Sequence, residues 1–136
     1  MKIDIVTIFP DFFISPLDSS IIARARQDNL VEIKSHDLRD FARDRHKTVD
    51  DTPYGGGGGM LIKTEPVMRA WETLELGRGL GIYLSADGQL LDQKLAAELS
   101  LQQHLVLLCG HYKGIDERIR RHCIDRGPAG ERAEHE

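Results

Sequence analysis

Residues 105–114 read LVLLCGHYKG, a run of five apolar residues followed by a polar turn with a glycine at each end. A continuous apolar run of this length is typical of a strand that is covered on both faces of a parallel sheet. A second run of this kind, Ile3–Phe9, ends at Pro10. The sequence therefore predicts a parallel sheet that contains these two strands.

Predicted helices and further strands alternate around these two runs. The helices are expected from Ser19 or Ser20 to about Asn29, from Thr64 to Leu74, from Asp92 to Leu99 and from Ile115 to Ile124, and the further strands at Val31–His36 and Gly81–Leu84. Thr64 and Asp92 are expected to cap their helices. In the first helix, the apolar residues expected on the buried side are Ile21, Ile22, Ala25 and Leu30. This alternation predicts an α/β fold with a mostly parallel sheet and helices on both faces.

The composition is that of a soluble globular chain. The 136 residues are 40% hydrophobic and 29% charged, which suits one domain with a single core. No apolar run is long enough to cross a bilayer, and this excludes a membrane-spanning segment. The formal net charge is −4, so any contact with nucleic acid must come from a local basic patch or from backbone groups. Cys109 and Cys123 lack metal-ligand spacing, which favours the reducing cytoplasm.

The end of the chain differs in character from the rest. Residues 126–136 read RGPAGERAEHE and contain no large apolar side chain. Such a composition is typical of a solvated, disordered tail. We therefore expect one folded domain over residues 1–125, followed by an atypical tail.

Gly55–Gly59 is a run of five glycines between Pro53-Tyr54 and Met60-Leu61. Each ordered glycine costs roughly 0.5–1 kcal/mol relative to alanine, so an ordered run is expected where the backbone approaches a ligand closely. A flexible linker is the alternative, although apolar flanks are atypical of such linkers. The run is not a P-loop, because no Lys-Ser or Lys-Thr follows it.

A charged segment precedes the glycines, within a long polar stretch (37–59) that lacks helical or strand periodicity. Arg45, His46 and Lys47 suit contacts to phosphates and bases, with Asp50 orienting a base or a cation. Two alternatives stay open: a solvated charge run, and a loose metal-ligand set for hydrolysis. That set would comprise Asp44, His46, Asp50 and Asp51.

The turn after residues 105–109 is a second candidate. Ligands of parallel α/β sheets bind at the carboxyl ends of the strands, so the segments after Leu84 and Cys109 are the ones to consider. Gly110 and Gly114 would let backbone groups face such a ligand. Tyr112 suits stacking on a purine, or simply covers the sheet.

Four segments together resemble the bacterial tRNA (guanine-N1)-methyltransferases, which modify the guanosine immediately 3′ of the anticodon. The resemblance covers about residues 1–125 in order and without a large gap. The matching segments are IFPDFF at Ile8–Phe13, RDFARDRHKTVDDTPYGGGGGM at Arg39–Met60, IYLS at Ile82–Ser85 and LLCGHYKGIDER at Leu107–Arg118.

The resemblance implies a SPOUT-type knotted methyltransferase fold, a cytoplasmic homodimer with active sites at the subunit interface, and tRNA as substrate. It implies S-adenosylmethionine as methyl donor and Mg²⁺ as a possible further cofactor. Carried over by position, the cofactor-binding residues are Tyr83, Leu84, Ser85, Gly110, Tyr112 and Gly114. The RNA-binding residues carried over in the same way are Arg45, His46, Lys47, Asp50 and Gly59.

The chain departs from the family pattern at Gly58 and Ala86, where the family commonly has Pro, and at Lys113, where it has Glu. Beyond residue 125 the family continues into a third cofactor loop and a C-terminal tRNA-binding domain that supplies the general base. We therefore expect a truncated enzyme with impaired methylation of guanine N1 at position 37 and no catalytic base of its own. A non-catalytic tRNA-binding or dimerising fragment is the alternative, and a metal-dependent hydrolase is a third.

Overall fold

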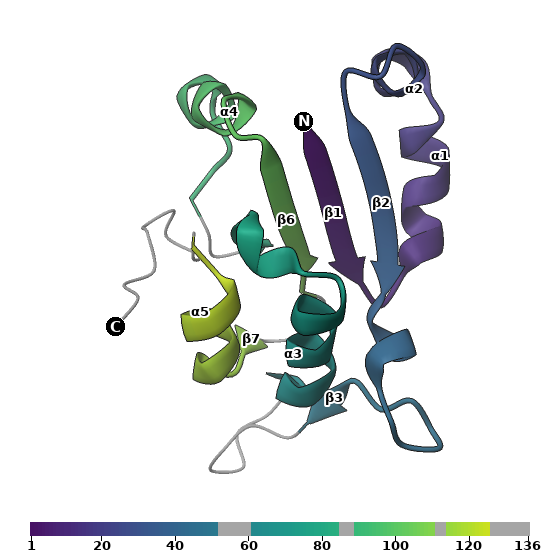
Figure 1. Cartoon of the computed structure of the whole chain (residues 1–136), viewed down its shortest axis with the longest axis vertical. Coiled ribbons are helices and arrows are strands. Elements are labelled where there is room, and N and C mark those ends of the chain that lie inside the picture. Colours follow the sequence, from purple (N-terminus) through teal and green to yellow (C-terminus); the bar gives the residue numbers. More distant parts are fainter. Residues whose placement is uncertain (52–60, 85–88, 111–113, 126–136) are drawn as a thin grey trace.

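The computed structural model describes residues 1–51, 61–84, 89–110 and 114–125. Its main sheet consists of four parallel strands in the order β2-β1-β6-β5. In Figure 1, β2, β1 and β6 run side by side in the same direction. The strands are β1 (Lys2–Thr7), β2 (Glu32–Asp37), β5 (Leu80–Leu84) and β6 (His104–Cys109).

The two apolar runs form the centre of this sheet, where β1 pairs with β6. Ile5 and Val6 are consecutive in β1 and both are buried, as are Leu105 and Val106 in β6. Because successive strand residues point to opposite faces, both faces of the central strands are covered. The predicted α/β fold with a mostly parallel sheet is therefore confirmed.

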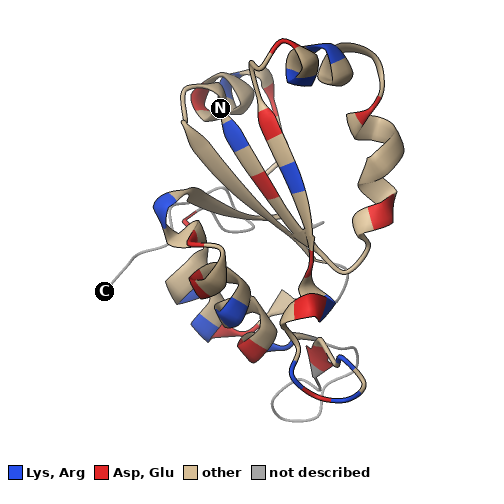
Figure 2. Cartoon of the chain, turned by 45° about the vertical axis from the view of Figure 1, so that its right-hand side comes forward, with Lys and Arg blue, Asp and Glu red and all other residues tan. Residues whose placement is uncertain are grey.

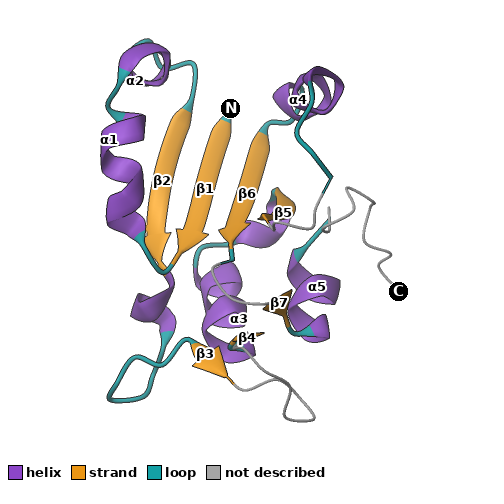
Figure 3. Cartoon of the chain, turned by 180° about the vertical axis from the view of Figure 1, so that it is seen from behind, coloured by secondary structure: helices purple, strands orange, loops and turns teal. Residues whose placement is uncertain are grey.

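Figure 3 shows α1 and α2 alongside β2, α4 near the start of β6, and α3 and α5 toward the carboxyl ends of the strands. Within the described ranges, every helix is too short or too polar to cross a membrane. The α-helices are α1 (Ile14–Leu17), α2 (Ser20–Gln27), α3 (Thr64–Thr73), α4 (Gln93–Ser100) and α5 (Glu117–Cys123). Short 3₁₀ segments are η1 (Pro10–Phe13), η2 (Leu38–Phe41) and η3 (Leu76–Arg78).

The main core lies where α3 and α5 pack together near the carboxyl ends of the strands. α3 buries Val67, Ala70 and Trp71, which share one face of the helix because they are three and four residues apart. α5 buries Ile119 and Cys123 in the same way. The same core contains Val6, Leu76, Val106 and Leu108.

The predicted helix caps have mixed outcomes. Asp92 caps α4 as expected, because its carboxylate accepts a hydrogen bond of 2.7 Å from the Leu95 N–H. The Thr64 cap is wrong: Thr64 is already helical, and Lys63 occupies the capping position without a side-chain hydrogen bond. α3 also ends slightly earlier than expected, since Glu75 adopts a left-handed φ of 54°.

The prediction that α2 buries an apolar side is wrong. Ile21 is 78% exposed, Ile22 38% and Leu30, just beyond the helix, 67%. Only Ala25 of the four predicted residues is half-buried. The helix lies outside the edge strand β2 (Figure 3), where among the described elements it packs mainly against α1. Helical periodicity marks an apolar side but does not determine whether another layer covers it.

The last predicted helix begins two residues later than expected. The preceding residues form β7 (Gly114–Ile115), which pairs with β4 (Leu61–Ile62), and β4 pairs with β3 (Asp50–Asp51). Strand pairing therefore keeps this segment extended up to Asp116, whose carboxylate caps α5. The small β3-β4-β7 sheet lies beyond the carboxyl ends of the main strands (Figures 1 and 3).

A buried carboxylate joins three strands of the main sheet. The Asp4 side chain on β1 is only 3% exposed, and its two oxygens lie 2.6 Å from His36 Nε2 on β2 and 2.6 Å from His104 Nε2 on β6. Lys2 Nζ lies 3.9 Å from the same carboxylate. One side chain thus connects both neighbours of β1.

The pKa of Asp4 reflects opposing effects. Burial raises it, but the hydrogen bonds to His36 and His104 and the charge of Lys2 lower it, and the net result is a pKa below the usual range. The carboxylate is therefore ionised at neutral pH and acts only as an acceptor. It follows that both histidines donate their Nε2 hydrogens to it.

Replacement of Asp4 tests this connection. Asp4→Ala should lower the free energy of unfolding by about 3 kcal/mol at pH 7, because it leaves two partly buried imidazole donors without an acceptor. Urea unfolding measures the loss. Asp28→Ala, which removes an exposed carboxylate at the end of α2, is the control and should change stability by less than about 0.5 kcal/mol.

The pH dependence has a defined sign. Because folding lowers the pKa of Asp4, its contribution is complete above the unfolded-state pKa of about 3.9 and declines as the pH falls through the folded-state value. The stability difference between the parent and Asp4→Ala should therefore shrink as the pH falls below about 4. A difference that persists at low pH would contradict this role.

Candidate functional site

The carboxyl ends of β5 and β6 lie next to each other. The parallel register pairs Leu84 with Cys109, the last residues of the two strands. The segments that leave these strands therefore start from one edge of the sheet, as the sequence predicted. Leu84 is 43% exposed and offers an apolar surface there.

Gly110 packs directly against Tyr83, another predicted site residue. A Cβ at position 110 would lie 2.6 Å from Tyr83 Cε2 and 2.8 Å from its hydroxyl oxygen. The Tyr83 side chain has little room to move because the residue is only 6% exposed. A residue with a Cβ at position 110 would therefore displace the Tyr83 ring, and glycine avoids this clash.

The other predicted residues of this turn are only partly within the described structure. Gly114 is half-buried in β7, where its backbone pairs with Leu61. The remaining predicted positions lie outside the described residues. These are Ser85 and Tyr112, Gly59 with the rest of the glycine run, and the departures Gly58, Ala86 and Lys113.

Arg45, His46 and Lys47 lie on an exposed turn between η2 and β3. Figure 2 shows basic and acidic residues along this loop, at the end of the molecule that carries the small sheet. The three side chains form no hydrogen bond or ion pair with another described residue. They are therefore available to a ligand in solution.

Asp44 and Thr48 close this turn on itself. The Asp44 carboxylate accepts a hydrogen bond of 2.6 Å from the Thr48 hydroxyl and bonds of 2.9 and 3.1 Å from the Thr48 N–H. The Thr48 hydroxyl and amide together lower the pKa of Asp44, so its carboxylate is ionised at neutral pH. Asp44 thus stabilises the conformation of the turn through its hydrogen bonds to Thr48.

The small sheet joins the two candidate segments. Asp50, at the end of the basic turn, pairs with Ile62 of β4, and Ile62 pairs with Ile115 of β7. In the sequence, β7 follows residues 110–113, the segment after β6. A short hydrogen-bonded ladder thus connects the basic turn with β7, although the two are about 65 residues apart in sequence.

The proposed metal-ligand set receives little support from the described side chains. Asp44 is engaged by Thr48, and within the described ranges no three His, Cys, Asp or Glu side chains gather closely enough to hold a metal ion. The two cysteines are poor nucleophiles. Burial raises the pKa of Cys109 to about 11, and burial together with the charge of Asp125 raises that of Cys123 to about 12.

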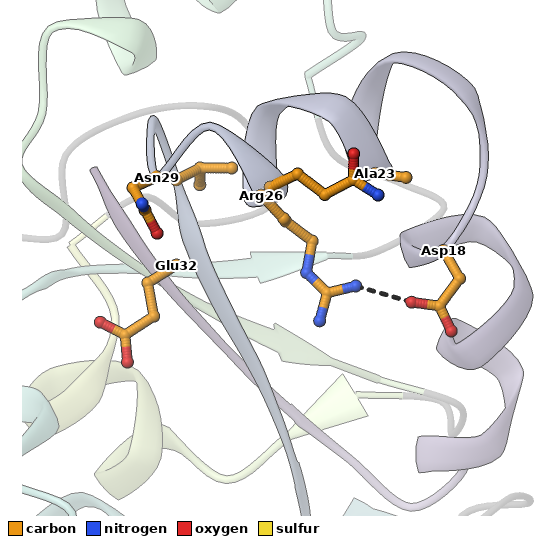
Figure 4. Close-up of a pocket in the computed structure, with 7 residues that line it drawn as sticks. Asp18, Ala23, Arg26, Asn29 and Glu32 are labelled. Atoms are coloured by element: carbon orange, nitrogen blue, oxygen red, sulfur yellow. Dashed lines mark hydrogen bonds and ion pairs between the residues drawn. The ribbon is translucent and has the colours of Figure 1, made fainter.

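An open cavity of about 610 Å³ lies elsewhere, between α2 and the start of β2 (Figure 4). In this cavity Arg26 Nη1 lies 2.9 Å from an Asp18 carboxylate oxygen and donates to the Leu17 carbonyl. Asn29 and Glu32 also line it. These residues mark the amino end of the sheet, opposite to Leu84 and Cys109, so the cavity is not part of the candidate site.

Sequence reasoning missed two groups of interacting residues. The Asp44–Thr48 contact has a local signal, an Asp and a Thr four residues apart on either side of three basic or titratable residues. The contacts of Asp4 with His36 and His104 have none, because the partners are 32 and 100 residues away.

Known proteins resemble this chain over most of its length. The family described as "tRNA (Guanine-1)-methyltransferase TrmD" matches residues 1–129. The tRNA (guanine-N(1)-)-methyltransferase of Carboxydothermus hydrogenoformans is 48% identical over 125 residues, and that of Dictyoglomus turgidum is 52% identical over 120. The crystal structure of tRNA (m1G37) methyltransferase from Aquifex aeolicus superposes with a TM-score of 0.86 at 32% identity.

These relatives are longer than the matched region. The chain is covered to 92% and 88% by the two sequence relatives, but each match spans 49% of the relative. The structural match covers 95% of this chain and 59% of the Aquifex chain. The chain thus spans about half the length of the curated relatives it matches.

The contact between Gly110 and Tyr83 can be tested by adding one methyl group. Gly110→Ala should lower the free energy of unfolding by about 1–3 kcal/mol, because a buried aromatic ring must shift to admit the Cβ. Gly77→Ala is the matched control, since a Cβ at position 77 meets nothing within 4 Å. Thermal and urea unfolding measure both variants, and equal stabilities would refute the packing argument.

Proposed function

The chain belongs to the tRNA (guanine-1)-methyltransferase family, and from this membership we propose that it serves methyl transfer from S-adenosylmethionine to guanine N1 at tRNA position 37, beside the anticodon. The observation that carries the proposal is the pairing of Leu84 with Cys109. It supports a single ligand site formed by both strand-end segments, with the basic turn joined to them by the small sheet.

On the cofactor side, the described residues fit a nucleoside-bearing ligand. Gly110 offers backbone groups at a strand end, Leu84 offers exposed apolar surface, and buried Tyr83 holds Gly110 in place. We propose that S-adenosylmethionine is held by these three residues together with Ser85, Tyr112 and Gly114. When bound, its sulfonium supplies an activated methyl group.

On the RNA side, the chain's net charge of −4 does not attract a polyanion, so local basic residues must do so. Arg45 and Lys47 are exposed and unpaired within the described structure, and we assign them to phosphates of the anticodon loop. His46, Asp50 and Gly59 complete the proposed RNA surface. Single-stranded loop bases are accessible for this kind of recognition and can be drawn out of their stack.

The reaction also requires a base. Guanine N1 carries a proton at neutral pH, and this proton must leave as the methyl group arrives. We assign this role to none of the residues 1–125, whose proposed tasks are to bind and orient the two reactants. The proposed catalytic base belongs to the family's C-terminal region.

We further propose that the family's cytoplasmic homodimer and knotted SPOUT topology apply to this protein. Exposed apolar side chains at one edge support a subunit contact: Phe12 is 71% exposed, Ile14 59% and Ile21 78%. Such a group of exposed large apolar residues is typical of an interaction surface.

Methyl transfer to defined transcripts tests the proposed reaction. The chain is incubated with methyl-labelled S-adenosylmethionine and a tRNA that carries guanosine at position 37. We expect label in this transcript, at a low level because the proposed base lies outside residues 1–125, and none in a matched transcript with adenosine at position 37. An N1 methyl group blocks Watson–Crick pairing, so a reverse-transcription stop at position 37 locates the product.

The results of this assay distinguish a methyltransferase from a non-catalytic tRNA-binding fragment. Binding that depends on guanosine 37 but gives no methyl transfer would favour the non-catalytic tRNA-binding fragment. If the chain shows no tRNA binding and no methyl transfer, the proposed function is overturned.

Lys113 allows a test of Mg²⁺ and cofactor contact. It stands where the family has Glu, so we expect Lys113→Glu to strengthen S-adenosylmethionine binding in the presence of Mg²⁺ and to make that binding Mg²⁺-dependent. Calorimetry with and without Mg²⁺ measures the effect. Lys94→Glu, an equal charge change on the exposed side of α4, is the control, and equal affinities in all three proteins would remove the idea.

A further inference from the structure

Asp44 is out of place in a surface that binds a polyanion. It lies between Arg43 and Arg45, and the turn that it begins carries His46 and Lys47. Its carboxylate is ionised, so on charge alone it repels phosphate and weakens the turn's attraction for RNA. Because its charge opposes RNA binding, we looked to the structure of the turn for the contribution of Asp44.

The geometry of the turn indicates that role. Thr48 donates to the Asp44 carboxylate from both its hydroxyl and its N–H, and the Lys47 N–H donates to the Asp44 carbonyl at 3.1 Å. Lys47 adopts a left-handed φ of 52°, a conformation that non-glycine residues rarely adopt without support. Asp44 thus closes the turn with both its side chain and its backbone.

The turn is also fixed at its two ends. Ala42 before it is 4% exposed, and Val49 after it is 3% exposed. The Val49 carbonyl accepts a hydrogen bond of 2.7 Å from the Lys63 N–H, at the start of α3. The exposed residues between these anchors therefore project from a constant position, and the Asp44–Thr48 contact determines their internal conformation.

We propose that Asp44 is a positioning residue, which holds Arg45 and Lys47 in the conformation that binds the tRNA backbone through its hydrogen bonds to Thr48. The proposal rests on the proposed RNA-binding role of this turn. An ordered turn loses less conformational entropy on binding than a flexible one, so fixing it strengthens binding even though it adds a negative charge.

The charge of Asp44 makes the test decisive, because the two effects have opposite signs. If only charge matters, Asp44→Ala binds tRNA more tightly than the parent. If Asp44 positions the turn, Asp44→Ala binds about five- to tenfold more weakly. Fluorescence anisotropy of labelled tRNA with the whole chain, at a fixed low salt concentration, measures the affinity.

Thr48 provides a matched pair of variants. Thr48→Ser keeps the hydroxyl and should bind like the parent, whereas Thr48→Val keeps the shape, removes the hydroxyl donor and should bind more weakly without any change in net charge. Melting temperatures of all variants should stay close to that of the parent, because the turn is exposed. Faster hydrogen exchange of the Thr48 amide in Asp44→Ala would report the opened turn directly.

Arg45→Ala separates this inference from the proposed function. It should weaken tRNA binding and reduce the slope of log affinity against log salt by about one. If it does so while Asp44→Ala and Thr48→Val bind as tightly as the parent, the positioning role is refuted and the RNA surface stands. If Arg45→Ala has no effect either, the RNA-binding role of the turn is wrong and the inference falls with it.

Discussion

The parallel pairing of β6 with both of its neighbours governs where the functional segments lie. On one side it pairs with β1, and on the other its register with β5 brings Leu84 beside Cys109. Parallel strands end at the same edge, so two chain segments that leave the sheet about 25 residues apart in sequence start next to each other. Gly110 then packs against the ring of Tyr83, which a residue with a Cβ could do only by displacing that ring.

Much of the main sheet could be predicted because its signals are local. The run Leu105–Cys109 is apolar enough to indicate a strand covered on both faces, and Asp92 caps its helix through a contact three residues away. The adjacency of the segments after Leu84 and Cys109 follows from a general rule for parallel sheets and needs no side-chain detail. By contrast, the burial of Tyr83 against Gly110 could not be predicted, because it depends on how the side chains of two neighbouring strands pack.

The failures have a common physical origin in non-local contacts. α2 shows helical periodicity, but its apolar residues are exposed because no described element covers them. Ile115 was expected to begin a helix, but it pairs with Ile62 of β4 instead. The basic turn differs from these cases: its residues were identified from composition, whereas its conformation depends on the contact between Asp44 and Thr48.

The contact between Asp4 and His104 has a consequence for biosynthesis. The two residues are separated by 100 positions, so β1 leaves the ribosome long before the strand that pairs with its inner edge. At about 5 to 20 residues per second, that interval lasts about 5 to 20 s. Throughout this time β2 is the only native neighbour of β1 that has been synthesised. The other edge of β1 stays open to non-native strand pairing. An ionised aspartate in the middle of the nascent strand makes such pairing unfavourable, and the same residue later becomes the acceptor that joins three strands.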